Sequence, residues 1–232
     1  MNAANLYALG AIALWASLAA LGVSLAHVPP FLLTGLGLLV GSLIALPLSR
    51  FDWRRWRVPA STLALGVYGL FGFHFLLFIA LRHAPPVQAN LVNYLWPLGI
   101  VVLAPLFLPG VRLAPRHIAA AIGSFAAVSG ALSLLCHALL EPTVALSLRD
   151  IALIAALGLG PLGGAFFLWD AALKRGDARQ IGVLSFLTPL LSTLTLLALR
   201  GERPSLSVLL AAAMIVGAAV VATRSKGQVR AR

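Results

Sequence analysis

Charged side chains are scarce in this sequence, and acidic ones are the scarcest. Only 10% of the residues are charged, with six Asp and Glu against seventeen Lys and Arg, whereas a soluble domain carries roughly 25%. Hydrophobic residues make up 61%, and the mean hydropathy is +1.00. A soluble domain is therefore excluded, and we expect a membrane protein whose apolar runs cross the bilayer as helices.

Reactive and metal-binding motifs are absent as well. Cys136 is the single cysteine, so no disulfide can form within the chain. The sequence holds no phosphate-binding loop, metal-ligand cluster or nucleophile motif, and it therefore predicts neither a cofactor nor an enzyme. The formal charge of +11 does not indicate nucleic-acid binding, because the basic residues lie in short loops between apolar segments.

Eight apolar segments are each expected to be a membrane-spanning helix, which predicts an all-α polytopic fold. They cover residues 6–27, 31–48, 58–81, 87–108, 118–140, 151–173, 181–199 and 206–223. The start, MNAANLYALG, lacks a basic n-region, so the first segment is expected to be a retained span and not a cleaved signal peptide.

The basic residues predict the orientation of these spans. Thirteen of the seventeen Lys and Arg follow the second, fourth or sixth segment or lie in the C-terminal tail. By the positive-inside rule, that side of the membrane is the cytoplasm. We therefore expect a multi-pass protein of the bacterial inner membrane with both termini cytoplasmic.

An internal repeat organises the chain. Residues 65–98 and 157–190 align without a gap at a shift of 92 residues (189 − 97 = 92). The informative matches are Gly66 with Gly158, Gly72 with Gly164, Gln88 with Gln180 and Pro97 with Pro189. The copies, 58–140 and 151–223, enter the membrane from opposite sides, and 1–57 supplies two further N-terminal spans. Inverted repeats are typical of transporters, so we predict an inverted-repeat helical bundle forming one domain, 1–232.

Two groups of glycines form small-residue helix faces. They are Gly37 and Gly41 in the second segment, and Gly160, Gly163 and Gly164 in the sixth. In lipid, such faces let helix backbones approach closely. We interpret both groups as packing surfaces.

His74 is the one titratable group well inside a span. Tyr68, Phe71, Phe75 and Phe78 recur beside it at spacings of three and four, which gives an aromatic stripe. Two interpretations stay open: a polar group in an aromatic cavity wall, or a neutral histidine bonded to a backbone carbonyl between helices. A metal site is not expected, because no second ligand lies three or four residues away.

A polar face and a proline mark the fourth segment. The face comprises Asn90, Asn93, Tyr94 and Pro97, with Trp96 on its flank. Pro97 lacks an N–H and frees a carbonyl one turn back, which is tolerated at this depth only against protein or a watery cavity. Pro189 repeats the break, with Ser185 and Thr188 beside it. Two matched breaks with polar neighbours predict a binding site, with a kinked packing helix as the alternative.

Carboxylates are not expected near the middle of the membrane. Glu141 and Glu202 fall in loops, and Asp170 lies near the cytoplasmic end of the sixth segment. Lys174 follows Asp170 by four residues, the spacing of a pair on one helix face, and we expect a local ion pair. A proton-coupled antiporter that works through a membrane glutamate is therefore disfavoured.

Three stretches carry a family resemblance: Gly72-x-His74 followed by LRHAPPVQANLVNYLWPL, then EPTV at 141–144, then GLGPLGGAFFLWDAALKRGDA. They resemble EamA-type members of the drug/metabolite transporter superfamily, and most of all the aromatic amino-acid exporters of the YddG type. The resemblance covers nearly the whole chain. It implies ten helices in two inverted halves around a cavity lined by His74, Tyr94 and Trp96.

The chain departs from that family pattern in one place. The family's sixth span, with parts of the fifth and seventh, has no counterpart, so about eight of the ten spans are visible. Segment 118–140 begins like the fifth span and ends like the seventh. Because those two spans run in the same direction, every later orientation is preserved, but one wall of the implied cavity is absent.

The expected function is export of amphipathic metabolites, chiefly neutral or aromatic amino acids, by alternating access without ion coupling. The predicted substrate-binding residues are His74, Asn90, Asn93, Tyr94, Trp96, Tyr68, Phe71 and Ser185, with Pro97 and Pro189 as gating breaks. A proton-coupled drug or metabolite antiporter and a non-transporting membrane scaffold are the alternatives. The expected partners are a small-molecule substrate and the lipid bilayer.

Overall fold

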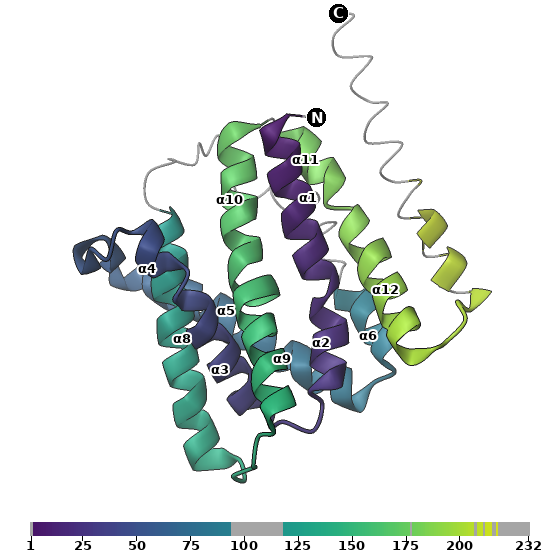
Figure 1. Ribbon diagram of the computed structural model, residues 1–232, viewed down its shortest axis with the longest axis horizontal. Helices are drawn as coiled ribbons and strands as arrows, with labels where there is room; N and C mark the ends of the chain where they lie inside the picture. The colour runs from purple at the N-terminus through teal and green to yellow at the C-terminus, as the bar shows by residue number, and fades with distance from the viewer. Residues whose placement is uncertain are drawn as a thin grey trace, which may run out of the picture.

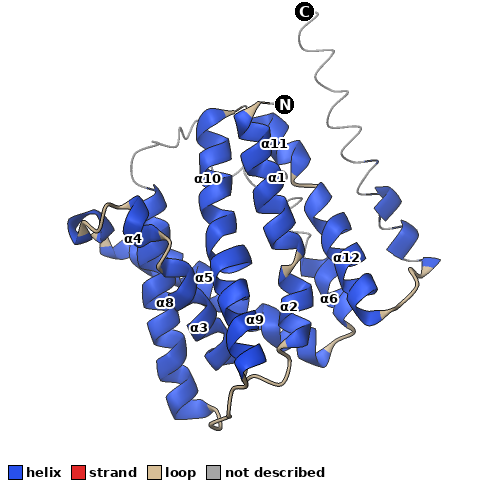
Figure 2. Cartoon of the chain, viewed as in Figure 1, coloured by secondary structure: helices blue, strands red, loops and turns tan. Residues whose placement is uncertain are grey.

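The computed structural model describes residues 2–93, 118–176, 178–206, 208–210, 212–214 and 217. All regular structure in these residues is helical (Figure 2). Six helical stretches in them are long and apolar enough to cross a membrane: Ala3–Ser24, Pro30–Leu48, Ala60–His83, Ala121–Leu140, Leu148–Arg175 and Ile181–Arg200. The predicted all-α polytopic membrane fold is confirmed. The predicted fourth and eighth segments lie largely outside the described residues.

The helices follow one another in a simple up-and-down order. The N-terminal part contains α1 (Ala3–Ala16), α2 (Leu18–Ser24), α3 (Pro30–Ser42), α4 (Ala45–Leu48), the 3₁₀ turn η1 (Trp53–Trp56), α5 (Ala60–His83) and α6 (Pro86–Asn93). The C-terminal part contains α8 (Ile118–Leu140), α9 (Leu148–Leu159), the π-helical turn η2 (Gly160–Gly164), α10 (Ala165–Arg175), α11 (Ala178–Leu184) and α12 (Leu187–Arg200).

Several spans are interrupted near their middle, and each interruption has a local cause. Between α1 and α2, the Ser17 hydroxyl donates to the Leu14 carbonyl at 2.7 Å and competes with the helix ladder. At η2, Pro161 has no N–H to continue the ladder, and the helix widens into a π turn. Between α11 and α12 the chain turns at residues 185–186, four residues before Pro189.

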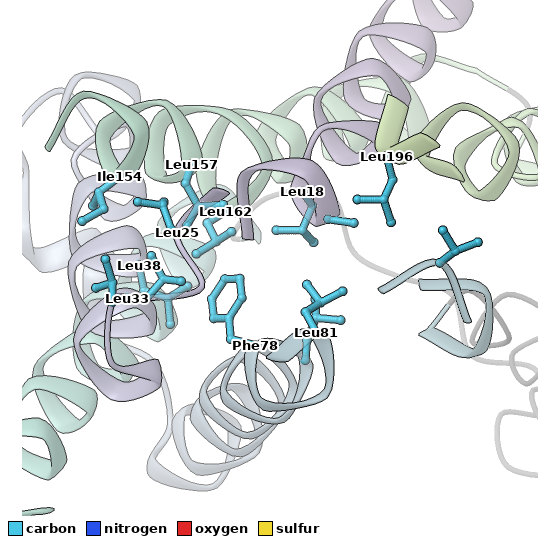
Figure 3. Packing of buried hydrophobic residues seen from close by; sticks show 14 of the residues in the cluster. Leu18, Leu25, Leu33, Leu38, Phe78, Leu81, Ile154, Leu157, Leu162 and Leu196 are labelled. Carbon is cyan, nitrogen blue, oxygen red and sulfur yellow. The ribbon is translucent and has the colours of Figure 1, made fainter. Parts of the chain in front are cut away.

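The bundle has two tightly packed groups of helices (Figure 1). α3 lies against α8 and α9, while α1 lies against α10 and α12. Side chains from α2, α3, α5, α9, η2 and α12 meet in the main apolar cluster (Figure 3), which includes Leu18, Leu33, Leu38, Phe78, Leu157, Leu162 and Leu196. This cluster holds the two parts of the chain together.

The two predicted glycine faces contact each other in part: Gly163 packs on Gly41 of α3, whereas Gly160 and Gly164 lie against Leu14 of α1. A Cβ on Gly41 would lie 2.9 Å from the carbonyl oxygens of both Gly158 and Leu162. A Cβ on Gly158 would lie 2.7 Å from the Gly37 carbonyl oxygen. Because the neighbours are backbone atoms that cannot turn away, only glycine permits this approach of α3 to α9 and η2.

Glu141 anchors the end of α8 to the beginning of α3. Its carboxylate accepts hydrogen bonds from the backbone N–H groups of Phe31 at 2.8 Å and Leu32 at 3.1 Å. Negative charge is favourable there, because the first N–H groups of a helix have no intrahelical partner. His137, one turn earlier on α8, lies 2.9 Å from the same carboxylate. The sequence predicted only that Glu141 lies in a loop, and it did not indicate that the carboxylate caps the start of α3.

Candidate functional site

His74 lies on the inner face of α5 with 1% of its surface exposed. Its Nδ1 is 2.9 Å from the Leu70 carbonyl oxygen one turn earlier, and because a carbonyl oxygen only accepts, Nδ1 is the donor. The Phe73 ring meets it edge-on at 4.9 Å between centroids, and the rings of Phe78 and Phe166 lie at 6.5 Å. The histidine therefore combines the backbone hydrogen bond of one interpretation with the aromatic surroundings of the other.

Aromatic side chains from α1 and α10 continue this group. The Trp15 ring lies 5.6 Å from Phe166 and 5.3 Å from Trp169. Trp15 follows the start of α1 by twelve residues, which is about 18 Å along a helix. In the described structure Trp15 packs within the bundle, against two aromatic residues of α10.

The other aromatic residues of α5 turn away from His74. Phe71 and Phe75 stack on Phe31 of α3, at 5.8 and 3.9 Å between centroids. Tyr68 is 79% exposed and packs into neither group. The structure therefore divides the aromatic stripe among the α3 contact, the inner face and the outer surface.

A buried polar cluster lies between α6 and α12. The Ser192 hydroxyl donates to the Asn90 Oδ1 at 3.2 Å, and both residues are at most 1% exposed. Within the described part of the chain, the Asn90 Nδ2 and the Thr188 and Thr193 hydroxyls are buried without a hydrogen-bond partner. Unsatisfied polar atoms cost about 1–3 kcal/mol each. Such a cluster is suited to receive a polar ligand or water.

A small apolar cavity lies beside the cluster. It has a volume of about 110 Å³ and is lined on the α12 side by Pro189, Thr193 and Leu197, facing Leu91 and Val208. Thr193 belongs to both the cavity wall and the polar cluster. The arrangement therefore offers polar atoms next to an apolar surface, as small-ligand sites do.

Near Pro189, the predicted residue Ser185 and its neighbour Thr188 form hydrogen bonds with the backbone where α11 ends and α12 begins. The Ser185 hydroxyl donates to the Gly182 carbonyl at 2.7 Å, and the Ser185 carbonyl accepts the Thr188 N–H at 3.0 Å. Pro189 cannot donate, and this tighter bond replaces the missing one. Asn93 is half-buried at the end of α6. Tyr94, Trp96 and Pro97 lie outside the described residues.

Asp170 and Lys174 form the predicted ion pair. The Lys174 ammonium donates to the Asp170 carboxylate at 2.5 Å, one turn along α10. The local-pair interpretation is confirmed. Sequence reasoning missed Ser192 and Thr193, although the spacing of four between Thr188 and Ser192 on an apolar helix was a usable signal.

Comparison with known proteins places the chain in a family. The model of the EamA-like transporter family matches residues 2–131 and again 124–224. The chain belongs to this family. It is a membrane transporter with helical spans, and its substrate is a small molecule. The two matches overlap at residues 124–131, inside α8.

Two relatives cover nearly the whole chain. A protein of Ancylobacter novellus named aromatic amino acid exporter YddG is 37% identical over 280 residues, covering 96% of this chain and 97% of that protein. A solved crystal structure, also 37% identical, superposes with a TM-score of 0.75 over 96% of this chain and 98% of the other. The alignment with the exporter is at least 48 positions longer than this chain (280 − 232 = 48).

Proposed function

We propose that this transporter exports aromatic and other neutral amino acids from the cytoplasm by alternating access. The observation that carries the proposal is the buried polar cluster of Asn90, Thr188, Ser192 and Thr193, which presents unpartnered amide and hydroxyl atoms between α6 and α12. The name of the 37% identical relative supports the substrate class. In this scheme the cluster binds the amino and carboxylate groups that all amino acids share.

The side-chain end of the substrate meets aromatic surfaces. His74, Phe166 and Trp15 form one such surface in the described residues, and the sequence adds Tyr94 and Trp96 one turn from Pro97. Stacking between aromatic groups is worth about 0.5–1.5 kcal/mol beyond area burial. Aromatic substrates therefore gain affinity over alanine, while the polar groups act on both.

Transport in this proposal needs no ion coupling. The Asp170 carboxylate is neutralised by Lys174, and Glu141 holds the start of α3 at a helix end. Neither carboxylate is left to bind a proton in the middle of a span. The substrate gradient is then the driving force, and the interruption before Pro189 supplies a point about which α11 and α12 rearrange.

The proposed location is the bacterial inner membrane with both termini in the cytoplasm. Thirteen of the seventeen basic residues lie on that side. A reporter fused after Arg232, or inserted between Arg54 and Arg55, should read as cytoplasmic. A periplasmic reading at either point contradicts this orientation.

Flux of phenylalanine and of alanine into liposomes tests the site. Asn90→Ala and Ser192→Ala should reduce both fluxes together, because the shared polar groups lose a partner. Trp96→Ala should lower phenylalanine flux roughly several-fold and spare alanine. Leu199→Ala, at an exposed position of α12 away from the cavity wall, is the control that should change neither.

The outcomes separate the competing functions. Uphill movement driven by a pH gradient alone would establish a proton-coupled antiporter. Absence of flux with either substrate, in protein that remains folded and monodisperse, would establish a non-transporting scaffold. Equal losses for both substrates in the Trp96 variant would mean that this tryptophan supports packing and not recognition.

A further inference from the structure

Among the six described spans, α5 has the least buried apolar surface. Only 17% of the apolar window of Ala60–His83 is buried, against 33–44% for the other five candidate spans in the described residues. The exposed residues recur at spacings of three and four, so they lie on one side of the helix. We call this side the open α5 face; it comprises Leu65, Tyr68, Gly69, Gly72, Phe73 and Leu76.

The repeat shows what covers the corresponding face in the second copy. At the shift of 92 residues, Tyr68, Gly69, Gly72 and Leu76 correspond to Gly160, Pro161, Gly164 and Leu168. There α1 is the cover: a Cβ on Gly160 or Gly164 would meet Leu14 at 3.6 or 3.4 Å. Leu168 in turn lies 3.2 Å from the Cβ position of Gly10. By contrast, a Cβ on Gly69 or Gly72 would meet no atom of the described residues within 4 Å.

Other contacts agree with a two-fold relation between the copies. The equivalent helices α5 and α9 each pack against a helix from the other part of the chain, α5 against α8 and α9 against α3. His74 and Phe166, which the same shift equates, face each other across 6.5 Å. Val92 on α6 is 66% exposed, whereas its equivalent Leu184 packs against the cluster around Ala8 of α1. Among the described residues, the first copy therefore shows no counterpart of the covering helix α1, and the alignment with the relative is at least 48 positions longer than this chain.

Lipid alone is a poor cover for this face. Tyr68 follows the start of α5 by eight residues, which is about 12 Å along the helix and within the span Ala60–His83. Tyr68 is 79% exposed, and hydrocarbon offers its hydroxyl no hydrogen-bond partner. Gly69 and Gly72 leave a shallow surface that an apolar helix can approach closely.

We propose that a second copy of this chain covers the open α5 face, with the two α5 helices packed side by side about a two-fold axis along the membrane normal. The face carries no charged residue between Ala60 and Leu81, so it buries against itself without desolvating a charge. The axis brings the glycines of both copies together and places the two Tyr68 hydroxyls beside each other. Isologous two-fold contacts are the commonest kind in homo-oligomers.

Cross-linking in native membranes tests the contact directly. In a Cys136→Ser background, which leaves no cysteine, Leu76→Cys should form a cross-linked dimer on oxidation. Leu194→Cys on α12, with 51% exposure against 63% for Leu76, is the matched control and should not. Cross-linking that is equal at both positions, or an adduct between Leu76→Cys and a different protein, would overturn the proposal.

Mass measurement supplies a second, independent readout. The purified protein in mild detergent should have twice the chain mass of 24.3 kDa. Gly69→Leu with Gly72→Leu should give the single-chain mass with unchanged folded yield, because each added side chain meets open space within its own copy. Gly182→Leu, at another glycine with open surroundings, should stay dimeric. A single-chain mass for the wild type, or a dimer that survives both glycine changes, contradicts the proposal. Neither readout depends on transport.

Discussion

The helices equated by the repeat, α5 and η2–α10, carry similar sequences but have different surroundings. Gly164 is covered by α1, whereas a Cβ on its equivalent Gly72 would meet no described atom within 4 Å. The same register of small residues therefore serves as an internal packing surface in one copy and as an outer surface in the other. In lipid, the presence of a neighbouring helix, and not the composition of the face, decides which of these it is.

The largest expected difference in stability is between leucine substitutions at Gly164 and at Gly72. Gly164→Leu adds a side chain whose Cβ would lie 3.4 Å from Leu14 of the covering helix α1 and 2.7 Å from the Leu159 carbonyl oxygen of its own span. Overpacking against backbone should cost about 3 kcal/mol, the upper part of the usual range. Gly72→Leu should leave folding of the single chain unchanged. Monodisperse yield and the thermal midpoint in detergent are the measurements, and equal tolerance of both changes would remove the difference between the copies.

A smaller effect compares a long-range helix cap with a local one. Glu141→Gln weakens the charge-assisted bonds to the Phe31 and Leu32 N–H groups, with an expected cost of about 1.5–3 kcal/mol. Ser147→Ala removes the capping box of α9, at about 1 kcal/mol. Glu202→Gln, in an exposed pair with Arg200, is the control and should shift the thermal midpoint least. A smaller loss for Glu141 than for Ser147 would mean that α8 does not hold α3.

A weaker effect on stability is expected for a change in the buried polar cluster, to which α6 of the first copy and α12 of the second both contribute. Ser192→Ala removes one hydrogen bond to Asn90, and such bonds between membrane helices average about 0.6 kcal/mol. Amino-acid flux should fall by more than this stability change explains, since the same hydroxyl is proposed to meet substrate. Thermal midpoint and flux are measured on one preparation. Parallel, small losses in both would assign the cluster to packing.

The smallest effect is expected at the ion pair of α10. Asp170→Asn leaves Lys174 half-buried without its carboxylate, and pairs at this spacing are worth about 0.3–0.5 kcal/mol. Gradient-driven flux should persist, because the pair is proposed to be structural. Flux is compared with and without a pH gradient in the wild type and the variant. Loss of uphill, proton-driven movement in Asp170→Asn would place coupling at this residue.

Much of the fold was predictable because the bilayer imposes it. Long apolar runs have to be helices, and the described helices begin and end close to the predicted segments. The glycine faces and the Asp170–Lys174 pair were predictable too, since each depends on spacing along one helix. The site was less accessible: Ser192 contacts Asn90 across 102 positions, and no local pattern connects them.

The sequence by itself determined the described spans and the break before Pro189, both of which follow from local chemistry and the demands of lipid. Only the tertiary structure decided which side of each helix is covered. These helices are apolar nearly all round, so periodicity does not mark an inner face. Phe71 turns to Phe31, His74 turns to Phe166 and Tyr68 stays outside. That division depends on which helices lie beside α5, and a missing neighbour leaves no trace in the sequence of α5 itself.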